Sequence, residues 1–323
     1  MGSEDVQFGT APTASRPVAF HMNIASLLPI GSSAGALAVI VVVLGPQVVN
    51  SQPSAAPSVK HAPEDATNAV PLEGAQRFFY NGDYGRAAEV TQRLCQARPD
   101  DFDACELRTA GLLFQIKKAL KDTGAVEKDT AWSQCAACPV LMSAFLAETA
   151  RSQTFARARL KDHPDEEDTL FFLGKVDLNY VWLQLGTLGH KTGWDEYWEA
   201  RRSLDHALRM DPRHVRARVA RAWVDYIVGT TVPRGVRWLL GGGNRKRGLL
   251  AVRDVVAQGN GDVFVQAEAT FALWDMQVRE HEVREAVATA RGLARDFPEN
   301  AELRTFLVDH DPPSRMTIPA AAP

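Results

Sequence analysis

The sequence lacks a charge excess of either sign. Its 323 residues include 36 lysines and arginines against 39 aspartates and glutamates, for a formal net charge of -3. Nucleic-acid-binding domains gather positive charge on one face. Here basic and acidic residues alternate through most of the chain, as they do on solvated helix faces. We therefore expect no nucleic-acid partner.

Recognisable catalytic patterns are also missing. The eight histidines are dispersed, and no two of them have the four-residue helical spacing with a nearby acid that a zinc protease needs. No nucleophile stands in a recognisable arrangement with a general base. The sequence thus predicts no catalytic residue, no metal site and no cofactor, and we expect a protein that is not an enzyme.

Cysteine is scarce, with four residues in the whole chain. Cys135 and Cys138 are separated by two alanines, a spacing that suits a disulfide, a redox pair or half of a zinc site. A redox pair needs a strand before its helix, and a zinc site needs two more ligands, whereas Cys95 and Cys105 are not closely spaced. Structural disulfides are favoured; free thiols and metal or redox chemistry are the alternatives. Four cysteines allow three pairings, and the sequence does not choose among them.

The longest apolar run is short for a membrane span. Residues 34–44 are continuously apolar, whereas a helix that crosses a bilayer needs about 20 residues. That length is typical of the hydrophobic core of a signal peptide, and the wider stretch 24–50 is long enough for a membrane anchor. We expect 1–23 to be disordered and 51–68, rich in Pro, Ser and Ala, to be a linker. A core strand or helix of a cytoplasmic protein is the remaining interpretation of the apolar run.

From Val70 onward the apolar residues recur at helical spacing. Asn81–Tyr84 forms a turn between two such blocks, Pro99 ends the second block, and Phe102–Phe114 begins the next helix. The apolar faces of the first two blocks are Ala75, Phe78 and Phe79, then Ala87, Thr91 and Leu94.

This unit resembles the tetratricopeptide repeat (TPR), in which a small residue, Gly-Asp-Tyr, an alanine and a closing proline recur with a period of about 34 residues. The matching residues here are Ala75, Gly82-Asp83-Tyr84, Ala87 and Pro99, and further closing prolines follow at Pro164, Pro212 and Pro298. The resemblance implies an all-α, right-handed superhelical solenoid of stacked helix-turn-helix pairs, with degenerate repeats, over 69–308. We expect a disordered tail over 309–323.

In the TPR family, the opening helix of each pair lines a concave surface that holds an extended peptide or a helix of a partner. The resemblance therefore implies a protein or peptide partner in this groove. For each candidate side chain, exposure to solvent or packing against the N-terminal segment is the alternative. The candidates, by alignment with the family, are Gln76, Phe79, Lys175, Asn179, Trp223, Tyr226 and Asp275.

A basic, glycine-rich loop occupies 241–247 and precedes an apolar helix. Glycine-rich loops at helix N-termini bind phosphate, but this one lacks the Gly-Lys-Ser/Thr ending of a nucleotide-binding loop and follows no predicted strand. A solvated inter-helix loop is favoured, and an anionic contact such as a lipid headgroup is the alternative. The surrounding stretch, 221–298, resembles bacterial envelope TPR proteins of unassigned role.

These patterns together predict a non-catalytic protein–protein interaction scaffold or adaptor in the periplasm or cell envelope, exported or anchored by 24–50. A periplasmic solute- or lipid-binding accessory component of a transport or secretion system is the second hypothesis. A redox or metal enzyme acting through the cysteines is the third, and a cytoplasmic location is the alternative to export.

Overall fold

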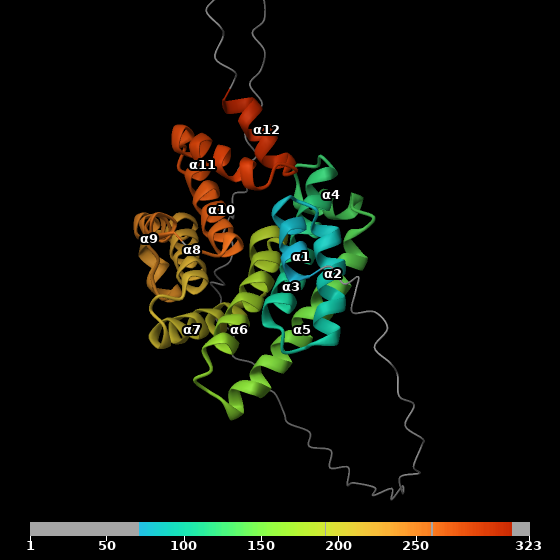
Figure 1. Cartoon of the computed structure of the whole chain (residues 1–323), viewed down its shortest axis with the longest axis vertical. Helices are drawn as coiled ribbons and strands as arrows, with labels where there is room; N and C mark the ends of the chain where they lie inside the picture. The colour runs from blue at the N-terminus through green and yellow to red at the C-terminus, as the bar shows by residue number, and fades with distance from the viewer. Residues whose placement is uncertain (1–70, 191, 260, 312–323) are drawn as a thin grey trace, which may run out of the picture.

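The computed structural model describes residues 71–311 except 191 and 260. The predicted segments 1–23, 24–50 and 51–68 lie outside the described residues, as does 312–323 of the predicted tail. Throughout the described residues the regular structure is helical, without a strand, which confirms the all-α prediction (Figure 1).

The helices follow one another with short connections. In chain order they are α1 (Leu72–Tyr80), α2 (Tyr84–Ala97), α3 (Phe102–Asp122), α4 (Lys128–Gln134), α5 (Cys138–Asp162), α6 (Glu167–Val181), the π-helix η2 (Trp182–Leu188), α7 (Trp194–Met210), α8 (Val215–Thr231), the 3-10 helix η3 (Arg234–Leu240), α9 (Arg245–Gln258), α10 (Val263–Arg279), α11 (Val283–Asp296) and α12 (Ala301–His310).

Local sequence signals set the helix boundaries. Each of the four predicted proline closures falls between two helices: α2 and α3, α5 and α6, α7 and α8, and α11 and α12. The Asp101 carboxylate, just after the first proline, accepts a hydrogen bond from Ala104 N at 3.1 Å and caps α3. Asp83 caps α2 in the same way through Arg86 N, also at 3.1 Å. Such caps satisfy backbone N–H groups that the first turn leaves unpaired.

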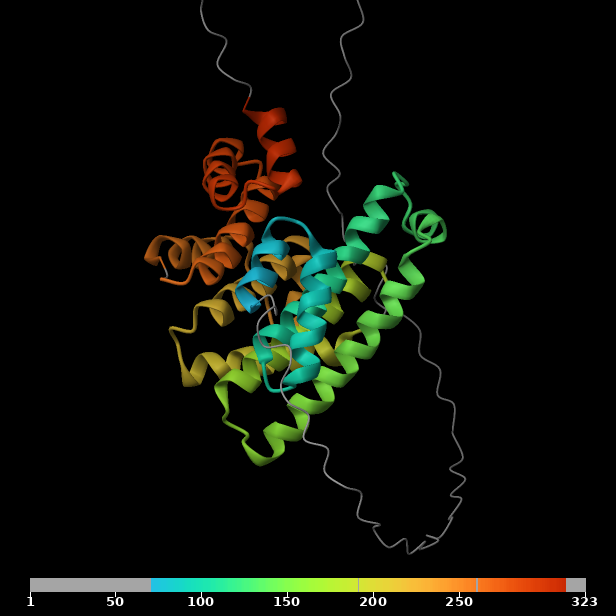
Figure 2. The same cartoon turned by 45° about the vertical axis from the view of Figure 1, so that its right-hand side comes forward.

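Consecutive helices pack against one another in neighbouring pairs (Figures 1 and 2). The crossings are close where a side chain is small. A Cβ on Gly174 of α6 would lie 2.8 Å from Leu204 of α7, and one on Gly111 of α3 would lie 3.1 Å from Ala88 of α2. A second set of contacts joins α1 to α3, α3 to α6, and α8 to α10. We call α1, α3, α6, α8 and α10 the inner layer, and α2, α5, α7, α9 and α11 the outer helices.

The two ends of the described chain meet. Helix α1 packs on α10, and the Tyr80 ring at the end of α1 stacks on Phe271 with centroids 5.4 Å apart. The Asn300 side chain, which caps α12, donates a hydrogen bond to Tyr80 O at 2.8 Å. Glu299 N donates to the Asn81 side chain at 3.1 Å. The first helix is thus fastened to the last three.

Two disulfides cross helix junctions. Cys95 of α2 is bonded to Cys105 of α3, and Cys135, which follows α4, is bonded to Cys138 at the start of α5. The structure thus contains one of the three pairings that the sequence left open. All four cysteines are buried.

Among the described helices, none is by itself both long enough and apolar enough to cross a membrane. Helices α4 and α5 meet that criterion only when taken together, and their axes bend by 101° at the break between them.

Candidate functional site

Charged side chains of the inner layer bind one another. The Glu268 carboxylate on α10 accepts from Lys175 Nζ at 2.6 Å and from Arg216 Nε at 2.7 Å. Arg216 on α8 also donates to Glu106 of α3 at 2.8 Å. The Asn179 side chain donates to Glu106 at 3.4 Å and to the Thr109 hydroxyl at 2.9 Å. We call Glu106, Lys175, Arg216 and Glu268 the inner ion cluster; it ties four inner helices together.

Burial and charge act in opposite directions on this cluster. Burial alone raises the pKa of Glu268, but the positive charges of Lys175 and Arg216 outweigh it and lower that pKa to about 2. Burial likewise lowers the pKa of Lys175, while Glu268 and Glu106 bring it above its ordinary value. Each charge therefore depends on its partners, because a buried ion without a partner is strongly unfavourable.

The other predicted groove residues lie in two further places. Trp223 and Tyr226 stack with centroids 5.7 Å apart, and the buried Tyr226 donates its hydroxyl to Glu280 at 2.8 Å. The half-buried Asp275 pairs with Arg279 at 2.8 Å. On α1, Gln76 is half-buried, and Phe79 packs edge-on against Tyr80, Tyr84 and Phe114. The structure brings Lys175 next to Asn179, and Trp223 next to Tyr226. The Lys175 and Asn179 polar atoms already bind protein groups.

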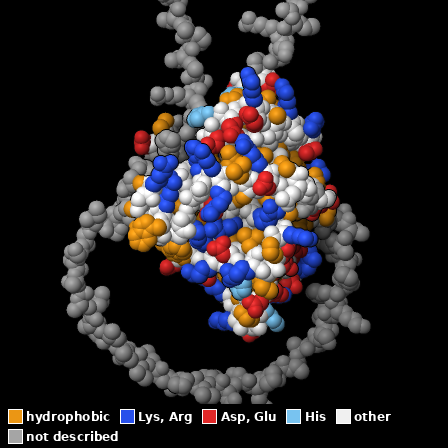
Figure 3. All heavy atoms as spheres, turned by 90° about the vertical axis from the view of Figure 1, so that its left-hand side faces the viewer, with side chains coloured by type: hydrophobic (Ala, Val, Ile, Leu, Met, Phe, Trp, Pro, Cys, Tyr) orange, Lys and Arg blue, Asp and Glu red, His pale blue; other side chains and the backbone are white. Residues whose placement is uncertain are grey.

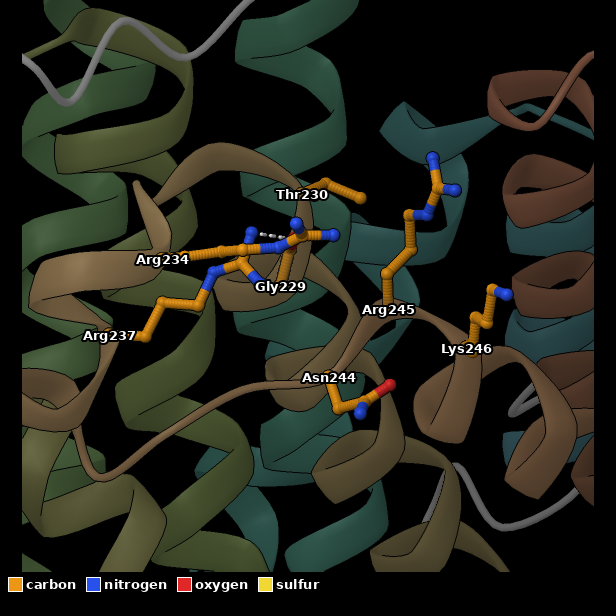
Figure 4. A pocket seen from close by; sticks show the side chains of 7 residues that line it. All are labelled: Gly229, Thr230, Arg234, Arg237, Asn244, Arg245 and Lys246. Carbon is orange, nitrogen blue, oxygen red and sulfur yellow. Dashed lines mark hydrogen bonds between the residues drawn. The ribbon is translucent and has the colours of Figure 1, made fainter.

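A hollow of about 630 Å³ opens beside the glycine-rich loop, where α8 ends and α9 begins. Arg234 and Arg237 reach into it from η3, and Arg245 and Lys246 project from the first turn of α9 (Figure 4). We call this hollow the basic pocket. Its lining residues are Gly229, Thr230, Arg234, Arg237, Asn244, Arg245 and Lys246.

The walls of the basic pocket are held by hydrogen bonds to backbone carbonyls. Arg237 donates to Gly229 O at 2.6 Å and to Val232 O at 2.7 Å, which fixes η3 against the end of α8. From α7, Arg201 donates to Leu240 O at 3.0 Å and to Gly241 O at 2.5 Å. These bonds give the loop a fixed course between α7 and α9.

The glycines of this region have packing roles. A Cβ on Gly229 would lie 2.3 Å from the backbone nitrogen of Arg245, and one on Gly248 would lie 2.6 Å from Ala222 O. Side chains there would separate α8 from α9. Gly241 and Gly242 have φ of 72° and 77°, the left-handed region that glycine adopts most easily. The glycine-rich pattern is therefore explained by a tight α8–α9 crossing and the turn before it.

The charges around the basic pocket are mostly uncompensated. Among the described residues no carboxylate lines it, and neither Arg234 nor Lys246 pairs with an acid there. Arg245 pairs with Glu280 at 3.3 Å across the rim. The start of α9 adds the partial positive charge of a helix N-terminus, although the Asn244 side chain caps it by accepting from Arg247 N at 3.0 Å. Such a site attracts anions.

A second polar cluster lies under α7. The carboxylate of Asp177 on α6 is completely buried, accepts from Gln153 Nε2 at 2.7 Å, and leaves Oδ2 without a hydrogen-bond partner among the described residues. Burial, reinforced by the negative charge of Glu199, raises the pKa of Asp177 to about 8. Glu199 in turn pairs with Arg157 and lines a smaller, mixed-charge hollow.

The described part of the chain brings no three histidine, cysteine or acidic side chains together in a way that could hold a metal ion. Cys135 and Cys138 are bonded to each other and buried, with Pro139 in the first turn of α5.

The sequence pattern indicates the 241–247 loop but not its partners on other elements. Arg201, Arg234 and Arg237 come from α7 and η3, and the sequence contains no motif that joins them to the loop. The two arginines that follow Pro233, Arg234 and Arg237, are the sequence feature that could have indicated these partners.

In comparisons with known proteins, no protein-family model, no curated protein and no solved structure matches the chain.

Proposed function

We propose that this protein is a non-catalytic scaffold that holds an anionic, phosphate-bearing ligand in the basic pocket. The observation that carries the proposal is the pocket itself, which is lined by four cations and by no carboxylate among the described residues. Arg and Lys side chains at a helix start are the groups that proteins use for phosphate.

The architecture proposed for this scaffold is a TPR-like solenoid of degenerate helix pairs. Its support is the helix pairing, the close crossings at Gly111 and Gly174, and the inner layer of opening helices. A protein or peptide partner on the inner side belongs to the same proposal. The inner ion cluster leaves fewer polar groups free for a partner on that side, because Lys175 and Asn179 already bind Glu268, Glu106 and Thr109.

A location in the periplasm or cell envelope is also proposed, with 24–50 as the exporting or anchoring segment. The two disulfides support it, because such bonds persist mainly in oxidising compartments. Mass analysis of the protein from its native host, with and without a thiol alkylating agent, tests this: alkylation of all four cysteines would contradict it.

Inorganic pyrophosphate is the probe for the basic pocket. We expect it to raise the melting temperature of the full chain in low salt, since a ligand that binds the folded state stabilises it. The double variant Arg234→Gln/Lys246→Gln should lose that rise. Neither side chain pairs with an acid among the described residues, so the substitutions leave no acid without its partner.

The matched control is Lys161→Gln/Arg213→Gln, which removes two exposed cations away from the pocket lining, one in the last turn of α5 and one between α7 and α8. It should keep the full pyrophosphate effect. An equal loss in both double variants would refute a localised site, and no rise in the unaltered protein would refute anion binding.

A further inference from the structure

An exposed apolar tip stands beside the basic pocket. The Trp238 side chain on η3 is 72% exposed and that of its neighbour Leu239 is 44% exposed. The same short helix packs Val236 and Leu240 against the core beneath it. The apolar residues of η3 therefore fall into two pairs. Val236 and Leu240 pack against the core, whereas Trp238 and Leu239 face solvent.

Two cations lie on the same short helix as this tip, and two more begin the helix that follows it. Arg234 and Arg237 lie on η3 with Trp238, and Arg245 and Lys246 start the next helix. The exposed Leu250 follows Lys246 by four residues, so the two share one face of α9. On the side of the molecule that carries α9, Lys and Arg side chains gather across the middle, with hydrophobic side chains exposed around them (Figure 3).

The tip is held rigidly. Arg201 and the Tyr197 hydroxyl both donate to Leu240 O, at 3.0 and 2.8 Å, and Arg237 in the last turn of η3 donates to Gly229 O. The Trp238 indole N–H donates to Gly235 O at 3.1 Å. Because its polar atom is already satisfied, the indole presents an apolar surface in a fixed place.

We propose that the η3–α9 tip docks on an anionic phospholipid bilayer, with lipid phosphates in the basic pocket and Trp238 and Leu239 inserted at headgroup level. The proposal rests on the anion-binding function above and names the source of the anion. Tryptophan is enriched at membrane–water interfaces, where its amphipathic ring is well accommodated. Each cation close to an anionic bilayer strengthens binding by about fivefold.

A bilayer explains both features of this surface together. A free phosphate would engage Arg234, Arg237, Arg245 and Lys246 but would leave Trp238 in water. A bilayer provides phosphates for the cations and an apolar layer for the protruding ring, which accounts for the exposure of Trp238.

The test uses the full chain with vesicles whose acyl chains are brominated, because bromine quenches tryptophan fluorescence only at close range. The vesicles contain phosphatidylcholine alone or equal parts of phosphatidylcholine and phosphatidylglycerol. The Trp238 signal is the difference between the protein and its Trp238→Phe variant. This difference isolates the tip from any vesicle contact made by the apolar segment 24–50, which both proteins share.

We expect Trp238-dependent quenching on vesicles that contain phosphatidylglycerol, little on phosphatidylcholine alone, and loss of the quenching in high salt. Arg234→Gln/Lys246→Gln should reduce vesicle affinity at the tip by roughly 25-fold, two cations at fivefold each. Lys161→Gln/Arg213→Gln should leave it unchanged.

Absence of Trp238-dependent quenching on the anionic vesicles would overturn the bilayer proposal. If pyrophosphate still stabilises the protein in that case, the anion site stands and its ligand is soluble. If pyrophosphate has no effect either, both proposals fail. Equal quenching on the two kinds of vesicle would also overturn the role of lipid phosphate.

Discussion

Asp177 should make the stability of this protein fall as pH rises. Its carboxyl is completely buried on α6 and has a pKa of about 8, because burial, helped by Glu199, disfavours the charged form. The folded protein therefore keeps a proton on Asp177 at pH values where the unfolded chain, with an ordinary aspartate pKa near 4, has lost it.

The magnitude follows from proton linkage. Between about pH 4 and pH 8 the folded state binds one proton more than the unfolded state at this residue, so the free energy of unfolding decreases by about 1.4 kcal/mol per pH unit. The full contribution of Asp177 is present below pH 4 and is lost as pH rises through 8. From pH 5 to pH 7 the expected loss is about 3 kcal/mol.

The informative substitution is Asp177→Asn, which is neutral at every pH and keeps an oxygen to accept from Gln153 Nε2. Urea unfolding at pH 5 and pH 7 should show that the variant does not have the loss of about 3 kcal/mol. The free energy of unfolding of the variant, relative to that of the parent, should therefore rise by that amount between pH 5 and pH 7. Titrating groups that do not interact with Asp177 are common to both proteins and cancel in the difference. Asp129→Asn, at an exposed aspartate, is the matched control and should follow the parent.

A parallel loss of stability in Asp177→Asn and the parent between the two pH values would refute a protonated Asp177 in the folded protein. That result would mean that Asp177 is already ionised in the folded state, which its burial and its unpartnered Oδ2 argue against.

Two further substitutions test other parts of the structure. Glu268→Gln should lower the free energy of unfolding by about 3–5 kcal/mol in urea titrations, because Lys175 and Arg216 lose their shared partner in a buried site; a change near zero would contradict the inner ion cluster. Gly229→Ala should cost about 1–3 kcal/mol and weaken the pyrophosphate effect, because its Cβ would lie 2.3 Å from the first backbone nitrogen of α9. Gly235→Ala, whose Cβ meets nothing within 4 Å, is the control and should change neither quantity.

The sequence was sufficient for the helices because their boundaries depend on neighbours in the chain. Pro99, Pro164, Pro212 and Pro298 each fall between helices, and the predicted turn at Asn81–Tyr84 separates α1 from α2. A proline, which lacks a backbone N–H, and a glycine in the left-handed conformation each end a helix within a few residues. Their effects can therefore be inferred from the local sequence.

The functional residues were harder to infer because their partners are distant in sequence. Glu268 meets Lys175 across 93 residues and Arg216 across 52, and no local sequence pattern joins the three. Lys175 was predicted to line the groove, but its acidic partners were not predicted. Similarly, the glycines near α9 matched a phosphate-loop pattern in part, whereas the structure shows that Gly229 and Gly248 serve the α8–α9 crossing. Only the three-dimensional arrangement showed that Arg234 and Arg237 join the basic residues of α9.

The fastening of α1 to the C-terminal helices affects how the molecule comes apart. An array of helix pairs with free ends frays from either end, each pair opening almost independently of distant ones. Here Tyr80 stacks on Phe271 and accepts from Asn300, so opening either end exposes the same aromatic contact. The two ends therefore protect each other, and amide hydrogens in α1 should exchange with solvent at rates close to those in α10 and α12.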